Sequence, residues 1–143
     1  MPKSTTASNA IMALIYNATA WANIADNAAS SPITNIYVAL ATASGSVGDT
    51  MATNEATYTN YLRQTVARTT SGWTAPSGGS TSNVAQITYP QCGVTGNTIT
   101  SAKTGVGSGT AAVLHYGDLN APIVVSNLIQ PVFAIGAITI TES

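Results

Sequence analysis

The stretch Ile36-Tyr37-Val38-Ala39-Leu40-Ala41 alternates larger apolar side chains with smaller or amphipathic ones. This period of two is the spacing at which a β-strand buries one face, so the stretch predicts a half-buried strand. Similar short runs recur along the chain, separated by segments that contain glycine, proline and serine. These further strand candidates span residues 62–69, 84–89, 95–100, 112–116, 123–125 and 131–141.

A short helix is predicted ahead of the strands, over residues 8–18. Ser8 is a suitable N-cap, and the positions that follow it form one apolar face with the spacing i, i+3, i+4 and i+7. That face consists of Ile11, Leu14, Ile15 and Ala18. We expect Trp21 and Ile24 to extend it, and residues 26–32, which end in a proline, to form a loop.

Together these elements predict a mainly β fold. We expect a single antiparallel β-sandwich or jelly-roll-like domain with a short N-terminal helix. Its closing run, residues 131–141, is apolar on both faces and is therefore expected to be a central strand. We divide the chain into an N-terminal arm and helix, residues 1–24, and a β-sandwich domain, residues 33–143.

Charge is scarce in this chain. Only 6% of its 143 residues are Asp, Glu, Lys or Arg, compared with about 25% in an ordinary soluble domain. The four basic residues are scattered, so the sequence predicts no nucleic-acid binding. We expect no membrane span and no secretion signal. Because the cores of protein interfaces are depleted in charge, this composition indicates a chain that works inside an assembly.

No group of residues predicts catalysis. His115 and Asp118 lack an activated serine, so we expect His115 at a rim or a partner contact. Asp49 and Glu55 lack the dense spacing of a calcium loop and are expected to be solvated. One cysteine and one histidine cannot complete a zinc site, and Cys92 is expected to be a small core residue. We therefore expect a non-enzyme without metal or cofactor.

Three aromatic residues have two interpretations. If Tyr58, Tyr61 and Trp73 are exposed, they form a stacking surface of the kind that binds sugars. If they are buried, they pack in the core or at a subunit interface. The sequence favours packing over sugar binding.

The stretch from Asn54 to Thr69, NEATYTNYLRQTVART, resembles a family of small virion proteins of tailed bacteriophages. Further landmarks agree with this resemblance, which covers nearly the whole chain. They are Ile36–Leu40, Gly72-Trp73, residues 78–83, Ile87–Pro90, His115–Leu119, Asn127–Pro131 and Phe133–Thr139. The chain departs from the family between Cys92 and Thr110.

The resemblance implies a virion setting. Family members are commonly described as tail-fibre-like, and similar small β-proteins serve as capsid cement, bound as trimers on the outer shell. We therefore expect a capsid decoration protein on the capsid surface, a homotrimer that binds the major capsid protein and stabilises the head. We expect no nucleic-acid or membrane partner. The alternative is a tail or fibre component that binds a host surface glycan.

The candidate partner contacts lie on the predicted helix and on the aromatic and histidine side chains. The predicted helix and the N-terminal arm are candidates for tethering the chain to its partner or for contacts within the trimer. The full set of contact residues is Ile11, Leu14, Ile15, Tyr58, Tyr61, Trp73 and His115.

Overall fold

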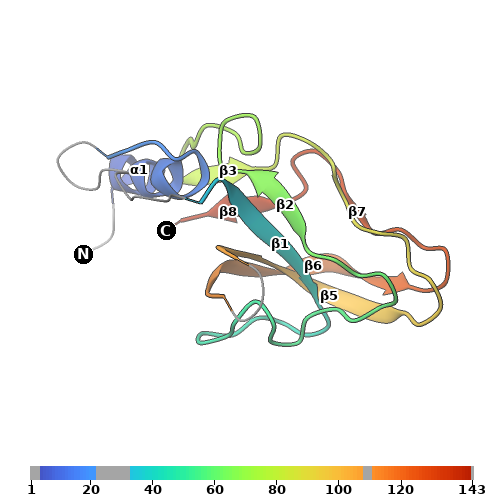
Figure 1. The fold of residues 1–143 in the computed structure, drawn as a ribbon. Coiled ribbons are helices and arrows are strands. Elements are labelled where there is room, and N and C mark those ends of the chain that lie inside the picture. Colours follow the sequence, from blue (N-terminus) through green and yellow to red (C-terminus); the bar gives the residue numbers. More distant parts are fainter. Residues whose placement is uncertain (1–3, 22–32, 108–110, 143) are drawn as a thin grey trace. The chain divides into compact units, whose positions relative to one another are not determined.

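The computed structural model describes residues 4–21, 33–107 and 111–142. Within them, one helix precedes eight strands (Figure 1). The elements are α1 (Thr5–Tyr16), β1 (Asn35–Ala41), β2 (Gln64–Ala67), β3 (Ser80–Ser82), β4 (Ile87–Thr88), β5 (Asn97–Gly105), β6 (Val113–Val125), β7 (Val132–Phe133) and β8 (Thr139–Thr141).

The strands form antiparallel sheets. A four-stranded sheet has the order β2-β1-β5-β6, and two smaller sheets pair β3 with β8 and β4 with β7. The pairings of β1 with β5, β5 with β6 and β3 with β8 are all antiparallel. The predicted mainly β, antiparallel fold with one short N-terminal helix is confirmed.

The chain forms two compact units whose segments alternate along the sequence. Unit 1 comprises residues 1–35, 66–86 and 133–143, and unit 2 comprises residues 36–65 and 87–132. Helix α1 therefore shares a unit with β3 and β8. The boundary that we predicted between residues 24 and 33 falls on positions 22–32, outside the described residues, so it stays a prediction.

Helix α1 begins at Thr5 rather than at Ser8. Its N-cap is Ser4, whose hydroxyl oxygen accepts a hydrogen bond of 3.2 Å from the backbone N–H of Ala7. This bond satisfies one of the amide groups that lack a partner in the first helical turn. At the other end Asn17 is the C-cap, and Ala18 has a left-handed φ of 53° that ends the helix. The predicted extension to Trp21 is wrong, and Ile24 lies outside the described residues.

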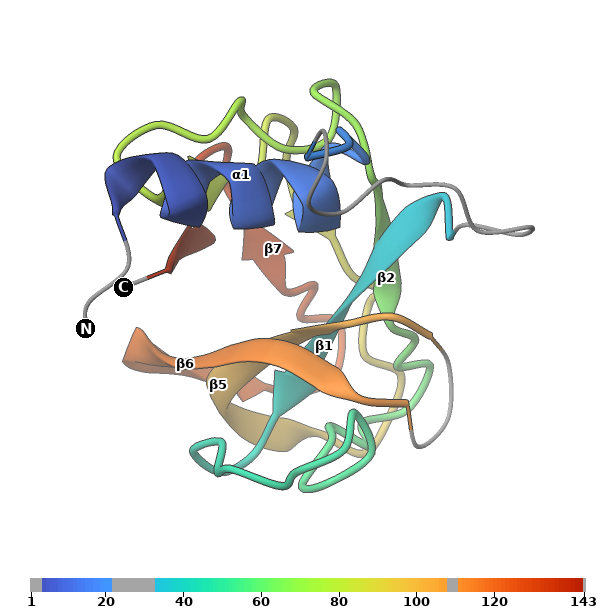
Figure 2. The same cartoon turned by 90° about the vertical axis from the view of Figure 1, so that its left-hand side faces the viewer.

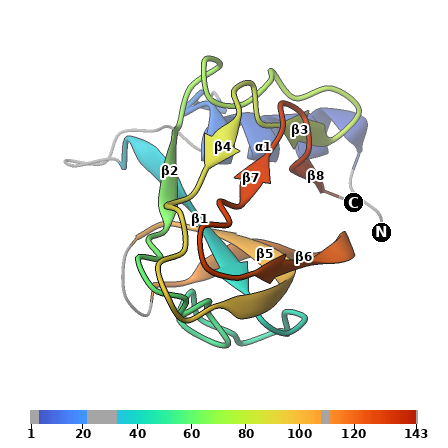
Figure 3. The same cartoon turned by 90° about the vertical axis from the view of Figure 1, so that its right-hand side faces the viewer.

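The buried side of α1 consists of Ser8, Met12 and Tyr16, which are spaced four residues apart. This face lies one position away from the one that the sequence predicted. The small Ser8 lets the helix approach closely, since a Cβ on Gly79 would lie 3.2 Å from the Ser8 Cβ. Tyr16 meets Trp73 edge to face, with ring centroids 4.8 Å apart. Figure 3 shows α1 beside β3 and β8 in unit 1.

Strand β1 is buried at every position from Val38 to Ala41, so the prediction of a half-buried strand is wrong. The strand lies inside the sheet, between β2 and β5. Tyr89 is 1% exposed, and its hydroxyl donates a hydrogen bond of 3.2 Å to the carbonyl of Val38. Loop residues cover the strand, so the alternating sequence of the strand does not give it a solvent-exposed face.

Strands β5 and β6 are both longer than predicted. β6 is one strand of 13 residues where the sequence predicted two short ones, and it lies beside β5 (Figure 2). The register jumps from Ser101 opposite Asp118 to Ile99 opposite Ile123, so β6 bulges at residues 119–122. Because β6 is the edge strand, Pro122 leaves no ladder hydrogen bond unmade inside the sheet.

The closing run is not the central strand that we expected. It is divided into β7 and β8 by a turn in which Gly136 has a φ of 73°, and Ile135 is 70% exposed. The side chain of buried Asn83 organises this turn. Its Nδ2 donates to the carbonyl of Ala134 at 2.8 Å, and its Oδ1 accepts from the N–H of Ile138 at 2.9 Å.

Candidate binding surface

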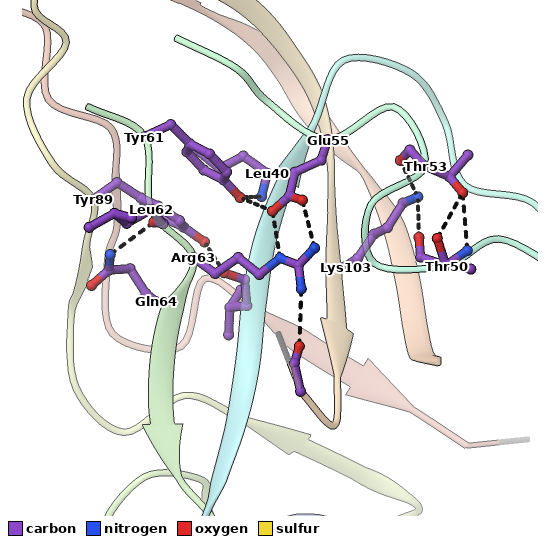
Figure 4. Close-up of polar contacts among 12 residues, drawn as sticks. Leu40, Thr50, Thr53, Glu55, Tyr61, Leu62, Arg63, Gln64, Tyr89 and Lys103 are labelled. Carbon is purple, nitrogen blue, oxygen red and sulfur yellow. Dashed lines mark hydrogen bonds and ion pairs between the residues drawn. The ribbon is translucent and has the colours of Figure 1, made fainter. Parts of the chain in front are cut away.

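The motif from Asn54 to Thr69 builds a polar cluster inside unit 2 (Figure 4). Glu55 and Arg63 form a two-point ion pair, with Nε–Oε1 and Nη2–Oε2 distances of 2.6 Å. Tyr61 donates to Glu55 Oε1 at 3.0 Å and accepts from the N–H of Leu40 at 3.0 Å. The hydrogen bonds that Arg63 donates to Glu55 raise the pKa of Arg63. The expectation of a solvated Glu55 is therefore wrong.

Asp49 is likewise paired rather than solvated. Lys103, whose side chain is fully buried, places its Nζ 3.1 Å from Asp49 Oδ2. The same ammonium group donates to the backbone carbonyls of Thr50 and Thr53, at 3.4 and 2.7 Å. The hydrogen bonds from Lys103 and from the N–H of Ser46 lower the pKa of the Asp49 carboxyl. The ammonium group of Lys103 therefore supplies the positive charge that faces this carboxylate.

Tyr58, Tyr61 and Trp73 are packed within the two units. Tyr58 is 2% exposed and its ring contacts that of Tyr61 edge to face, with centroids 5.3 Å apart. Burial raises the pKa of Tyr58 to about 12 and also raises that of Tyr61. Trp73 is fully buried in unit 1. Tyr58 and Trp73 are therefore core residues, and their side chains are not accessible as the partner contacts that we expected. Their burial agrees with the packing interpretation.

The other candidate contacts are partly accessible. Ile11, Leu14 and Ile15 are half-buried on α1. His115 is half-buried on β6, opposite Thr104. Their role as partner contacts stays a prediction. Cys92 is 1% exposed, as expected of a small core residue.

Three loops of unit 2 are joined by hydrogen bonds and carry four of the exposed large apolar side chains of that unit. The middle loop, residues 91–96, bonds to residues 58–62 through Gly93 N–H and Thr59 C=O at 3.1 Å. It bonds to residues 126–130 through Cys92 N–H and Ile129 C=O at 2.8 Å. We call the exposed apolar residues of these loops the loop surface: Leu62 (66% exposed), Val94 (83%), Leu128 (67%) and Ile129 (43%).

The backbone of the loop surface is unusual at Leu128, which has a left-handed φ of 68°. A branched side chain in this region is strained by about 1–2 kcal/mol. Surrounding hydrogen bonds maintain the conformation: Leu128 N–H donates to Cys92 C=O at 2.9 Å, and Gln91 Nε2 donates to Leu128 C=O at 2.8 Å. The fold thus holds a strained leucine with its side chain largely in solvent. Such outliers occur preferentially at binding sites.

Sequence reasoning missed the loop surface. Val94, Leu128 and Ile129 lie in segments without periodicity. Leu62 was assigned to the predicted strand over residues 62–69, whereas β2 begins at Gln64. One signal was available: residues 58–62, 91–96 and 126–130 contain no Asp, Glu, Lys or Arg. An uncharged loop with an isolated leucine or valine is a weak sign of a contact surface.

Within the described ranges, no three His, Cys, Asp or Glu side chains are grouped so that they could hold a metal ion. The described part of the chain also contains no helix with the length and apolar character needed to cross a membrane.

Comparison with known proteins places the chain in a family. The family model described as Podophage GP4 fiber I protein gp80 matches residues 2–141. The chain belongs to the gp80 fiber I family. This membership confirms the resemblance to small virion proteins of tailed bacteriophages and identifies a structural protein of the phage virion. No curated protein matches this gp80 family member.

Proposed function

We propose that the chain is a non-catalytic structural component of a virion fibre and binds another virion protein through the loop surface. The observation that carries the proposal is the combination of exposure and apolar character at Leu62, Val94, Leu128 and Ile129. Complete burial of one such side chain contributes about 1.5–3 kcal/mol. The description of the family as a fibre protein supports a fibre location.

A protein partner fits this surface better than a glycan. Two of the aromatic residues expected to form a sugar-stacking surface, Tyr58 and Trp73, are 2% and 0% exposed, and no residue of the loop surface is aromatic. The loop surface instead offers aliphatic side chains on loops without charge. The buried centre of a protein interface is likewise more apolar than the rest of the surface and depleted in charge.

Capsid decoration is the second candidate function. The chain would then bind the major capsid protein on the outer shell as a homotrimer and stabilise the head. The lack of a fibrous repeat in the sequence favours this candidate, because a fibre shaft is normally built from repeated units. Many weak contacts spread over a shell can add up to strong attachment.

Electron microscopy of virions labelled with an antibody against the chain separates the two locations. Label at the fibres with few copies per virion supports the fibre proposal. Label over the whole head, with many copies, supports capsid decoration. Label at neither place contradicts both.

Rebinding tests the surface itself. Virions that lack the protein are mixed with the wild-type chain, with Leu128→Asn or with Val47→Asn, and the bound fraction is measured by co-sedimentation. Val47 is the matched control because it is 92% exposed and lies outside the loop surface. We expect Leu128→Asn to weaken binding about tenfold or more and Val47→Asn to leave it unchanged. Equal binding by both variants would contradict the role of the loop surface in binding.

A further inference from the structure

Gln91 joins two of the three loops that form the loop surface. Its side chain is exposed, and its Nε2 donates a hydrogen bond of 2.8 Å to the backbone carbonyl of Leu128. The opposite orientation of the Gln91 amide would place its oxygen against that carbonyl, so only the observed orientation forms this bond. Gln91 therefore holds the backbone of a residue that lies 37 positions further along the chain.

The backbone of Gln91 is itself held by the third loop. Asn60 Nδ2 donates a hydrogen bond of 3.3 Å to the backbone carbonyl of Gln91. Asn60 has a left-handed φ of 77°, a conformation that asparagine adopts more readily than most residues. Two side-chain amides thus connect residues 58–62, 91–96 and 126–130 within unit 2. Gln91 is the middle member of this connection.

The connection matters most at Leu128, because this is the strained residue of the loop surface. Leu62, Val94 and Ile129 have no positive φ. The net contribution of one hydrogen bond to stability is of the same order as the strain of a left-handed leucine. Removing the bond from Gln91 should therefore lower the fraction of molecules in which Leu128 is left-handed. In the remaining molecules the leucine side chain points in a different direction.

We propose that Gln91 is a positioning residue for the binding of another virion protein. Through its hydrogen bond to the carbonyl of Leu128, it fixes the direction in which the leucine side chain is presented. This inference rests on the proposed function, since it concerns the same loop surface. It goes further by giving a role to an exposed polar residue that acts without touching the partner. A surface that is ordered before binding loses less conformational entropy when the partner arrives, so the bond should increase the affinity.

The conformation of Leu128 in the free chain tests the first step. Gln91→Met keeps the length of the side chain and removes its N–H donor. Gln130→Met is the matched control, because Gln130 is an exposed glutamine in the same loop as Leu128. Circular dichroism confirms that each variant is folded.

A strong nuclear Overhauser effect (NOE) between the amide proton and the α proton of one residue marks a positive φ. We expect this NOE at Leu128 in the wild-type chain and in Gln130→Met, and a weaker NOE in Gln91→Met. An NOE of unchanged strength in Gln91→Met overturns the proposal.

Rebinding to virions that lack the protein tests the second step. We expect Gln91→Met to weaken binding about two- to tenfold and Gln130→Met to leave it unchanged. Added to Leu128→Asn, Gln91→Met should have no further effect, because the side chain that it positions is gone. Added to Leu62→Asn, it should keep its full effect. An equal loss of binding in both backgrounds would mean that Gln91 contacts the partner itself, and this result overturns the proposal.

The proposed function can fail separately from this inference. If the wild-type chain does not rebind, or if Leu128→Asn rebinds equally well, the loop surface is not the contact and the proposed function is wrong. The role of Gln91 in binding is then overturned with it. The NOE at Leu128 is measured without virions, so it still decides whether Gln91 fixes the conformation of this residue.

Discussion

The Nζ of Lys103 lies 3.1 Å from Oδ2 of Asp49, and the lysine side chain is fully buried while that of the aspartate is 13% exposed. Lys103 is on β5, and Asp49 lies in the loop that follows β1. The ion pair therefore fastens a long loop to the centre of the sheet. Lys103 and Asp49, two of the few charged residues of the chain, thus hold this loop against the sheet.

This anchor should make the protein sensitive to acid. The hydrogen bond from Lys103 lowers the pKa of the Asp49 carboxyl below its ordinary value of 3.8. A lowered pKa in the folded state means that the stabilisation is present above pH 3.8 and is lost as the pH falls through the folded value. We expect Asp49→Asn to lower the free energy of unfolding at neutral pH and to have a smaller effect in strong acid. Urea unfolding of both proteins measures this, and a difference independent of pH would refute the role of the ion pair.

The pair between Glu55 and Arg63 should contribute more than a surface ion pair. Its side chains are 17% and 10% exposed, and both of its N–O distances are 2.6 Å. Removing one partner of a buried pair leaves the other charge uncompensated, so Glu55→Gln should destabilise the fold by about 3 kcal/mol. The matched control is Asp118→Asn, which alters an exposed carboxylate and should change stability by less than about 1 kcal/mol. Equal effects in urea unfolding would contradict this difference.

Arg68 should hold the end of α1. Its Nε donates to the carbonyl of Ile15 at 2.6 Å, and its Nη2 donates to that of Leu14. These are carbonyls of the last helical turn, which have no partner within the helix. We expect Arg68→Met to lower the free energy of unfolding by about 2 kcal/mol. Arg68→Lys should recover only part of it, because a single ammonium group cannot reproduce the fork of the guanidinium. Full recovery in thermal unfolding would show that charge alone matters.

High pH should unfold unit 2 through its tyrosines. Burial raises the pKa of Tyr58 to about 12 from 10.0. A raised pKa means that this stabilisation is complete below pH 10 and is lost as the pH rises toward 12. Phenolate absorbance and circular dichroism should therefore change together in an alkaline titration. Tyr58→Phe should move the unfolding transition to higher pH, and ionisation well before unfolding would disprove the coupling.

Leu128→Asn should separate stability from binding. Asparagine tolerates the left-handed region better than leucine does, so we expect the free energy of unfolding to rise by about 0.5–1 kcal/mol. The same substitution should weaken virion binding, as argued above. Leu62→Asn is the control for the stability measurement, because Leu62 is 66% exposed and has no positive φ. A lower free energy of unfolding in Leu128→Asn would mean that the leucine side chain packs within the folded chain, which contradicts its role as a residue kept exposed for a partner.

Periodicity predicted the elements whose pattern is local. The stretch Ile36–Ala41 and the run from Leu62 to Thr69 both contain a strand, and a helix precedes them. Periodicity failed where a distant side chain takes part. Asn83 bonds to the backbone at Ala134 and Ile138, and this contact turns a continuous apolar run into two short strands. A local sequence pattern cannot predict a hydrogen-bond partner that lies 51 positions away in the chain.

The candidate site was harder to predict than the fold. Burial of Tyr58 and Trp73 depends on which segments cover them, so the sequence left two interpretations open and favoured the correct one. Asp49 and Glu55 looked isolated because their basic partners lie 54 and 8 positions away. Val94, Leu128 and Ile129 carry no periodic signal, and the alternation that includes Leu62 predicted a strand rather than a loop. Their importance follows from exposure and from the strained backbone, and both are properties of the folded chain.

The alternation of the two units along the chain affects how the protein can be manipulated. Unit 1 is built from three separate segments and contains both the first and the last described residues, Ser4 and Glu142. Shortening the chain from either terminus therefore removes part of unit 1 and cannot release unit 2 as a fragment. A reporter fused to either terminus is attached to unit 1, while the loop surface and β6 belong to unit 2. Terminal tags are thus suited to following the protein in virions without altering the sequence of the unit that carries the loop surface.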